Sequence, residues 1–404
     1  MDAREVGQRI ARARRRRGLS QAVLAGLVDR SESWLSQVER GKRRIDSHTV
    51  LTRLAQILRA DISELTGPED DDQLSGRLYS AAAEIEKAMM CYAVIEESVA
   101  RQSAPNPSSF ANLLFRIRSA YRDYQATRYE ETGRVLPAII RDTEAANRST
   151  GPGHPVACEA RTLAYDTAAA LLSRVGEKTL AWTAADRAMS AAEQSGQPIL
   201  TALISYRLAY ILANRKYPDE AIQLSMTAAS ALERTMKSPS PDLLSVYGGL
   251  HLAAASAAAT GYDRSMTPRF LQKARATAER LGRDANLMRT GFGPVNVAIH
   301  TMATSIRLGD ARTAIEIGES LDPGMLPPAL VGRRTQVHLD LAQAYAMRRM
   351  DAAAVNVLLS AERLSPQLVR FDDRTRDVIT ALLRREHRAS TPELRPLARR
   401  AGMV

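Results

Sequence analysis

The sequence predicts an all-α protein in two parts, a small N-terminal domain of five short helices and a longer C-terminal array of paired helices. Apolar residues recur at helical spacing through most of the 404 residues, aromatic residues make up only 5%, and alanine- and leucine-rich stretches alternate with short turns. A chain of this length is too long for one small domain, so we expect at least two compact units.

Positive charge is concentrated at the N-terminus. The formal net charge is +11, and residues 1–66 contain 14 lysines and arginines against 8 aspartates and glutamates, or +6. Such an asymmetry predicts a polyanionic partner bound at that end of the chain. The remaining +5 is typical of an ordinary solvated surface.

The first predicted helix covers residues 3–17, with Val6, Ile10 and Ala13 facing inward, and Gly18 ends it. Five arginines crowd its C-terminal end: Arg12, Arg14, Arg15, Arg16 and Arg17. Cations suit that end of a helix dipole, but capping does not require so many. We therefore expect phosphate contacts there, and the alternative is a solvated face.

Residues 20–44 predict two short helices, 20–28 and 31–40, joined by a tight corner. Val23, Leu24 and Leu27 form the apolar stripe of the first helix. Ser31 is placed to cap the second helix, and Gly41 is placed to stop it. Three cations, Lys42, Arg43 and Arg44, follow at once. This layout suits a helix that enters the major groove while its neighbours contact phosphates.

The motifs SQ at residues 20–21, SQVERGK at 36–42 and TVLTRLAQILRADISELTG at 49–67 resemble the phage-repressor or Cro-type helix-turn-helix, the XRE family. The resemblance implies a five-helix DNA-binding domain over residues 1–67, with its last two helices at 47–58 and 63–66. The corner Val28-Asp29-Arg30 departs from the family, where a glycine is commoner. Read without the resemblance, the same residues also suit two amphipathic helices of an ordinary bundle.

The resemblance also implies which residues contact DNA. Glu32, Ser33 and Gln37 take the positions that read base edges, where glutamate accepts from cytosine and glutamine grips adenine. Gln21 takes a position that touches phosphate and braces the reading helix. The full expected set is Arg15, Arg16, Gln21, Arg30, Ser31, Glu32, Ser33, Ser36, Gln37, Arg40, Lys42, Arg43 and Arg44.

A boundary follows the first domain. The run GPEDDD at residues 67–72 combines helix breakers with four acidic residues that repel one another. We assign residues 68–109 to an acidic linker and a connecting helix at 74–100, which ends in a loop with two prolines.

Residues 110–388 predict a helical repeat. Short turns at 174–176, 215–217, 260–262, 308–310 and 348–350 separate alanine- and leucine-rich helices at steps of about 40 residues. The pattern resembles tetratricopeptide-type (TPR-like) repeats, without strict adherence to their 34-residue consensus. Such pairs stack into a curved solenoid whose concave face is lined by the first helix of each pair. An irregular helical bundle is the alternative, and residues 389–404 are expected to be a C-terminal tail.

Polar and aromatic residues four apart recur on the first helices, and such pairs share a helix face. They predict a cavity for a peptide or small molecule, lined by Tyr206, Tyr210, His251, Asn296, His300, Arg334 and His338. Each pair alone is more often a satisfied interhelical hydrogen bond than a ligand contact. The GFGPVN run at 291–296 and the alanine- and arginine-rich composition resemble actinobacterial XRE regulators with TPR-like C-terminal regions.

Enzymatic motifs are absent from the sequence: it has no phosphate-binding GxxxxGK[ST], no HExxH and no nucleophile elbow. The six histidines lack metal-ligand spacing, and Cys91 and Cys158 are too few for a disulfide framework. We expect no catalysis, no cofactor and no metal. No apolar run of membrane-spanning length is apparent and the N-terminus does not resemble a signal peptide, so we expect a cytoplasmic protein without a membrane partner.

These features predict a homodimeric transcriptional regulator that binds a double-stranded DNA operator and senses a peptide or small-molecule effector. The alternative is a DNA-anchored interaction scaffold whose repeats recruit a protein partner without ligand sensing.

Overall fold

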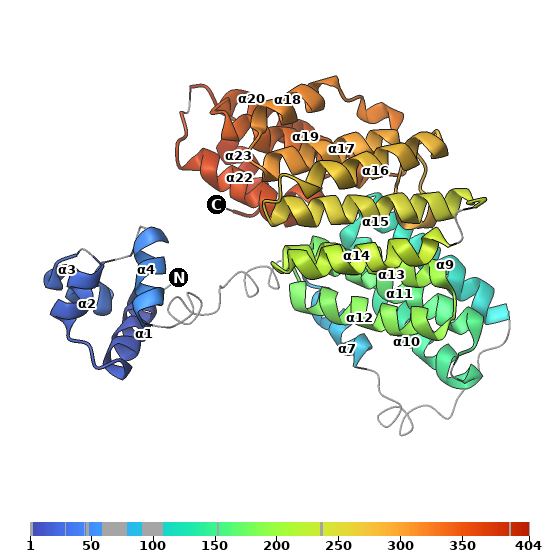
Figure 1. Ribbon diagram of the computed structural model, residues 1–404, viewed down its shortest axis with the longest axis horizontal. Helices are drawn as coiled ribbons and strands as arrows, with labels where there is room; N and C mark the ends of the chain where they lie inside the picture. Colours follow the sequence, from blue (N-terminus) through green and yellow to red (C-terminus); the bar gives the residue numbers. More distant parts are fainter. Residues whose placement is uncertain are drawn as a thin grey trace. The chain divides into compact units, whose positions relative to one another are not determined.

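The computed structural model describes residues 3–28, 30–43, 45, 48–58, 79–90, 108–151, 153–234, 237–387 and 389–403. The chain divides into two compact units, residues 1–77 and 78–404. Every regular element in the described ranges is a helix, which confirms the all-α prediction (Figure 1).

The N-terminal unit packs four described helices around one apolar core. They are α1 (Ala3–Arg16), α2 (Gln21–Leu27), α3 (Glu32–Glu39) and α4 (His48–Leu58). Ile10, Leu24, Leu35 and Leu54 form its centre and are fully buried. Gly7 lets α1 cross α3 closely, since a Cβ there would lie 2.1 Å from the Val38 carbonyl oxygen. The fifth helix, predicted at 63–66, lies outside the described residues.

The predicted start and stop of α3 are present. The Ser31 hydroxyl accepts a hydrogen bond from the Trp34 N–H at 3.1 Å. Gly41 has a φ of +69°, and the Lys42 N–H donates to the Gln37 carbonyl at 2.9 Å. This is the left-handed turn that favours glycine after a helix.

The predicted apolar stripe of α2 was wrong at two of its three positions. Leu24 is fully buried, whereas Val23 is 50% exposed and Leu27 is 46% exposed. Val23 and Leu27 lie four residues apart and share a face, while Leu24 and Ala25 face the core. A helix of seven residues needs only one or two inward side chains to pack against the core. The presence of other apolar residues in it therefore does not show that they are buried.

The C-terminal unit is a succession of helix pairs, which confirms the predicted helical solenoid. After α7 (Ala82–Met89), the pairs are α9 (Ser108–Gln125) with α10 (Tyr129–Thr150), α11 (Pro155–Arg174) with α12 (Lys178–Gln194), α13 (Pro198–Asn214) with α14 (Pro218–Glu233), α15 (Pro241–Thr260) with α16 (Met266–Leu281), α17 (Pro294–Arg307) with α18 (Ala311–Ser320) and α19 (Val331–Met347) with α20 (Asp351–Leu364). Short helices α21 (Pro366–Phe371), α22 (Asp373–Leu383) and α23 (Leu394–Arg400) follow, and single 3₁₀ turns occur at η1 (Leu287–Arg289) and η2 (Pro323–Met325).

The first helix of every pair ends in the same left-handed turn. Residues with φ between 59° and 86° occupy it: Thr127, Gly176, Lys216, Tyr262, Gly309 and Arg349. In each case the next N–H reaches back across the turn, as when Glu177 donates to the Leu172 carbonyl at 2.9 Å. Five of these turns lie at the predicted repeat boundaries. The sixth, at Thr127, was not predicted and makes α9 and α10 an additional pair.

Helix α15 is the central core helix of this unit (Figure 1), packed against α13 and α14 on one side and α16 and α17 on the other. It is long and apolar enough to cross a membrane by length and composition, contrary to the expectation that no such run exists. However, 94% of its apolar window is buried inside the protein. Its many alanines account for the high hydropathy, and because they are small they let neighbouring helices approach closely.

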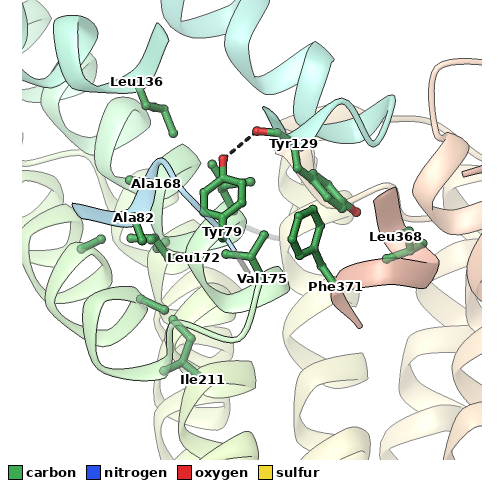
Figure 2. Packing of buried hydrophobic residues seen from close by; sticks show 14 of the residues in the cluster. Tyr79, Ala82, Tyr129, Leu136, Ala168, Leu172, Val175, Ile211, Leu368 and Phe371 are labelled. Atoms are coloured by element: carbon green, nitrogen blue, oxygen red, sulfur yellow. Dashed lines mark hydrogen bonds between the residues drawn. The ribbon is translucent and has the colours of Figure 1, made fainter. Parts of the chain in front are cut away.

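The two ends of the helical array meet. Tyr79, which precedes α7, donates its hydroxyl to the Tyr129 carbonyl at 2.6 Å, and its ring packs edge-on against Phe371 of α21 at 5.5 Å (Figure 2). The Glu130 N–H also donates to Gln367 Oε1 at 3.0 Å. The solenoid therefore closes on itself, and its concave face becomes the lining of a central cavity.

Both segments that the sequence set apart at the edges of the repeats pack into this unit. Ile85 and Ala88 of α7 are fully buried, and so are Leu394 and Leu397 of α23. The range expected to be a tail thus contains a packed helix, while the acidic run at 67–72 and the second loop at 102–107 lie outside the described residues.

Candidate DNA interface and central cavity

Both ends of α3 present exposed polar residues. Ser31, Glu32 and Ser33 are exposed where the helix begins, and Lys42 and Arg43 are exposed just after it ends. Glu32, in the first turn, suits the positive end of the helix dipole. Hydrogen-bonding side chains at the start of a helix, with cations beyond its end, suit base and phosphate contacts respectively.

A buried ion pair fixes the orientation of α3. Glu39 accepts from Arg14 Nε at 2.6 Å, from Arg14 Nη2 at 2.9 Å and from Gln21 Nε2 at 2.6 Å. Burial alone would raise the pKa of Glu39, but the bonds from Arg14 and Gln21 lower it below its usual value. One carboxylate thus ties α1 and α2 to the end of α3.

The other expected DNA residues have mixed environments. Gln21 braces α3 through Glu39, the Ser36 hydroxyl accepts from Arg40 Nη2 at 2.7 Å, and Arg30 stacks 5.9 Å from the Trp34 ring centre. Gln37 is half-buried, and Arg15 and Arg40 are exposed. Arg44 and the side chain of Arg16 lie outside the described residues.

The concave face of the repeats contains a cavity of about 370 Å³. Inner helices α9, α11, α13, α17 and α19 supply most of its walls, and α10, α12, α15, α22 and the loop at 289–291 supply the rest. Seven arginines and one lysine line it, against three aspartates. The positive side chains are Arg174, Lys178, Arg207, Arg215, Arg289, Arg307, Arg333 and Arg374.

Three of the seven expected ligand residues line this cavity: Tyr206, Tyr210 and His300. The Tyr210 ring lies 5.2 Å from that of Tyr206 and 6.0 Å from that of His300. Arg333 connects them, because its Nη2 donates to Tyr206 Oη at 3.2 Å and its Nη1 lies 3.4 Å from His300 Nε2.

The other four expected ligand residues do not line it. Asn296 is buried at the start of α17, and His251 packs edge-on against Tyr247 with ring centres 4.7 Å apart. Arg334 donates to the Leu326 carbonyl at 2.7 Å, and His338 Nδ1 lies 3.1 Å from the Arg334 carbonyl oxygen.

The loop that contains the GFGPVN run forms part of the cavity wall. Arg289 donates to the Leu163 carbonyl at 2.8 Å and to Asp166 at 3.0 Å, and its guanidinium lies 4.3 Å from the Tyr121 ring centre. Phe292 is fully buried against Gly248, where a Cβ would lie 2.0 Å from its ring. The loop is thus anchored on α9, α11 and α15 at once.

The end of the same loop starts α17. Asp284 accepts from the N–H groups of Val295 and Asn296, both at 3.1 Å, and so caps the helix. Gly293 is required beside it, because a Cβ there would lie 2.4 Å from the Asp284 backbone. The GFGPVN run therefore has a structural explanation in this fold.

Some cavity arginines have carboxylate partners and some do not. Asp166 bonds Arg207 at 2.9 Å and Arg289 at 3.0 Å, and Asp372 lies 3.3 Å from Arg174. Within the part of the chain that the structure describes, neither Arg307 nor Arg333 forms an ion pair. Burial together with Arg374 lowers the pKa of Arg307 to about 10.

Burial shifts the pKa values of two groups beside these arginines. Burial lowers the pKa of His300 well below its ordinary value, and Arg333 and Arg307 lower it further. Burial raises the pKa of Asp340. Sequence reasoning missed the cavity arginines, although Arg207 and Arg307 are the only charged residues in the runs SYRLAY and TSIRLG. Among the described residues, no cluster of His, Cys, Asp and Glu is placed to hold a metal ion.

Comparison with known proteins supports the reading of the N-terminal unit. Residues 5–66 match a family described as helix-turn-helix domain. No curated protein matches the chain. Solved structures similar to it include Bacillus thuringiensis PlcR in complex with the peptide PapR7 and DNA, at 14% identity and a TM-score of 0.37, over 86% of this chain and 98% of that one.

A structural likeness of that size carries no argument about what this chain binds. The family match and the capped geometry of α2 and α3 agree over the same residues. The chain thus carries a helix-turn-helix domain at its N-terminus.

Proposed function

We propose that this protein is a sequence-specific DNA-binding transcriptional regulator of the XRE type, in which α3 enters the major groove. One observation carries the proposal: the start of α3 is exposed and polar, while its far end is locked by Glu39 to α1 and α2. A reading helix must present side chains to base edges from a rigid support, and α3 meets both conditions.

The residues divide into two groups by chemistry. Glu32, Ser33 and Gln37 read base edges, with Ser36 and Arg40 beside them. Ser31, Gln21 and the cations Arg15, Arg16, Arg30, Lys42, Arg43 and Arg44 hold phosphates on either side. The +6 charge of residues 1–66 supports this division, because phosphate contacts supply much of the affinity for DNA.

The regulator acts as a homodimer in this proposal. One helix-turn-helix domain covers a half-site, and two such domains bind half-sites about 34–36 Å apart, one turn of DNA. The repeat unit provides the two-fold contact.

The repeat unit senses an effector in its central cavity, with Tyr206, Tyr210 and His300 as contacts. A cavity of about 370 Å³ falls within the range of small-molecule sites. A bound effector changes DNA affinity only as far as it prefers one state of the repeats over another. An interaction scaffold, the alternative, would not need this cavity.

Selection of the full chain against random duplex DNA tests the proposal. We expect enrichment of an inverted repeat whose half-sites lie about one helical turn apart. Enrichment of a single half-site would contradict the homodimer but support sequence-specific DNA binding. A pool that stays random after repeated rounds at low salt would overturn the proposal.

A further inference from the structure

We propose that the central cavity binds a compact anion with at least two negative charges, held between Arg307 and Arg333 beside the Tyr210 hydroxyl. The inference rests on the proposed function, since it names the chemical class of the effector.

The first argument is unbalanced charge. Arg307 donates to the Ser256 hydroxyl at 3.0 Å, and Arg333 contacts Tyr206 and His300. Both arginines are recessed in the cavity wall, and none of these three partners is a carboxylate. Charges removed from water are normally paired in proteins. Two recessed guanidinium groups without an acid therefore mark a place for an anionic ligand.

Two of the three aspartates that line the cavity have other partners. Asp372 accepts from the Thr375 N–H at 3.0 Å and the Thr375 hydroxyl at 2.9 Å, so it caps α22 while it pairs with Arg174. Asp340 accepts from Gln336 Nε2 at 2.8 Å, and burial disfavours its charged form by raising its pKa.

The second argument is unsatisfied hydrogen-bonding capacity. Three residues of the lining have a buried donor atom without a partner: Tyr210 Oη, Arg207 Nη2 and Arg289 Nη2. Buried polar atoms are rarely left unpaired in native proteins, and each costs stability. Tyr210, Arg207 and Arg289 line the same cavity as Arg307 and Arg333. A ligand with several acceptor oxygens satisfies these donors together.

Phosphate and carboxylate groups share the required chemistry. Both present paired oxygens that match a guanidinium in a bidentate arrangement. An anion among these arginines also offsets their mutual repulsion. After burial, Arg374 is the next cause of the lowered pKa of Arg307, and Arg333 and Arg307 add to the effect of burial on the pKa of His300. The cavity volume suits a small molecule.

Calorimetric titration of the full chain without DNA, at constant ionic strength in chloride, tests the inference. The titrants are inorganic pyrophosphate, inorganic phosphate and malonate. We expect saturable binding of one pyrophosphate per chain. Inorganic phosphate should bind more weakly, because it has a single phosphoryl group. The malonate arm shows whether carboxylates serve as well as phosphates.

Variants place the site. Arg307→Met and Arg333→Met should each weaken binding about tenfold or more, because each removes a hydrogen bond between charged groups. Tyr210→Phe keeps the ring packed against Tyr206 and should weaken binding by a smaller factor. Arg269→Met, at an exposed position of α16, is the matched control and should bind as the parent does.

The outcomes separate this inference from the proposed function. No saturable binding by any of the three anions, or binding that survives both Arg307→Met and Tyr210→Phe, overturns it; if Arg307→Met fails to fold, Tyr210→Phe alone decides. If pyrophosphate binds through these residues and leaves affinity for the selected DNA unchanged, the anion site stands and the sensing role falls. If none binds yet another effector changes DNA affinity, sensing stands and the anion site falls.

Discussion

The two units use arginine in opposite ways. In the N-terminal unit, Arg14 points inward and meets one carboxylate, Glu39, while Arg15 and Arg43 point outward. In the C-terminal unit, Arg307 and Arg333 point into a cavity and meet no carboxylate. We therefore propose that the same residue type serves as a structural brace at Arg14, as a phosphate contact at Arg15 and Arg43, and as the wall of an anion site at Arg307 and Arg333. Packing decides which, and net charge alone does not.

The largest expected effect concerns the ion pair between Arg14 and Glu39 that holds α3. Glu39→Ala leaves Arg14 buried without its partner and should destabilise the N-terminal unit by about 3–5 kcal/mol. Denaturant unfolding, with hydrogen exchange of α1 and α3 to localise the loss, measures it. The control is Glu32→Ala, exposed on the same helix, which should cost below about 1 kcal/mol. Equal effects at the two positions would show that the ion pair does not brace α3.

A second prediction concerns a buried histidine that the cavity does not use. Burial, with a smaller contribution from Lys273, lowers the pKa of His251 to about 4. The unfolded value is about 6.5, so the folded state favours neutral His251. Its stabilising contribution is complete above pH 6.5 and falls between pH 6.5 and about 4, by about 3 kcal/mol in all.

His251→Phe removes this acid sensitivity. Urea unfolding midpoints of the parent and the variant should therefore converge or cross as the pH falls from 7 to 4. Curves that stay parallel over this range would place the titration elsewhere.

A third prediction tests whether Arg307 stabilises the fold, as the paired arginines do. Arg307→Met removes a recessed, unpaired cation, so the free energy of unfolding should stay the same or rise by up to about 2 kcal/mol without ligand. Asp166→Ala, which strands Arg207 and Arg289 without their shared acid, is the contrasting control and should be strongly destabilising. Comparable losses in both variants would mean that Arg307 is a structural residue after all.

Much of the repeat could be predicted from local sequence. Gly176 and Gly309 lie at left-handed turns where glycine is favoured, and these turns mark the repeat boundaries. Thr127, Lys216, Tyr262 and Arg349 adopt the same conformation without a glycine, so glycine alone does not mark every turn, and the turn at Thr127 was not predicted. In the N-terminal unit the caps Ser31 and Gly41 could be predicted from the sequence, because each caps α3 through residues close to it in the chain.

Contacts distant in sequence could not be predicted. The closure of the repeats depends on Tyr79 meeting Phe371, and no local pattern links them. The cavity arginines were counted with the charges of an ordinary solvated surface, because the sequence of a helix does not show which of its faces lines a cavity. The pairing of residues four apart placed Tyr206 and Tyr210 on a shared cavity wall but not Asn296 with His300.

The smallest expected effect concerns the repeated turn. Gly309 has a φ of +84° and no atom near its missing side chain, so Gly309→Ala adds only backbone strain, about 1 kcal/mol. Tyr262, which holds the same turn with a φ of 59°, offers the reverse change. Tyr262→Gly should be neutral or mildly stabilising in thermal unfolding. Losses of the same size in both variants would contradict the strain account.

In the proposed complex, α3 reads base edges while the cations around it hold the DNA backbone. Affinity for the selected duplex and for a scrambled one, measured across salt concentrations with Gln37→Ala and Arg43→Ala, tests it most directly. Gln37→Ala should lose about 1–3 kcal/mol on the selected duplex alone, with an unchanged salt slope. Arg43→Ala should weaken both duplexes and reduce the slope by about one. A Gln37→Ala variant that keeps the parent's full preference for the selected duplex would contradict the claim.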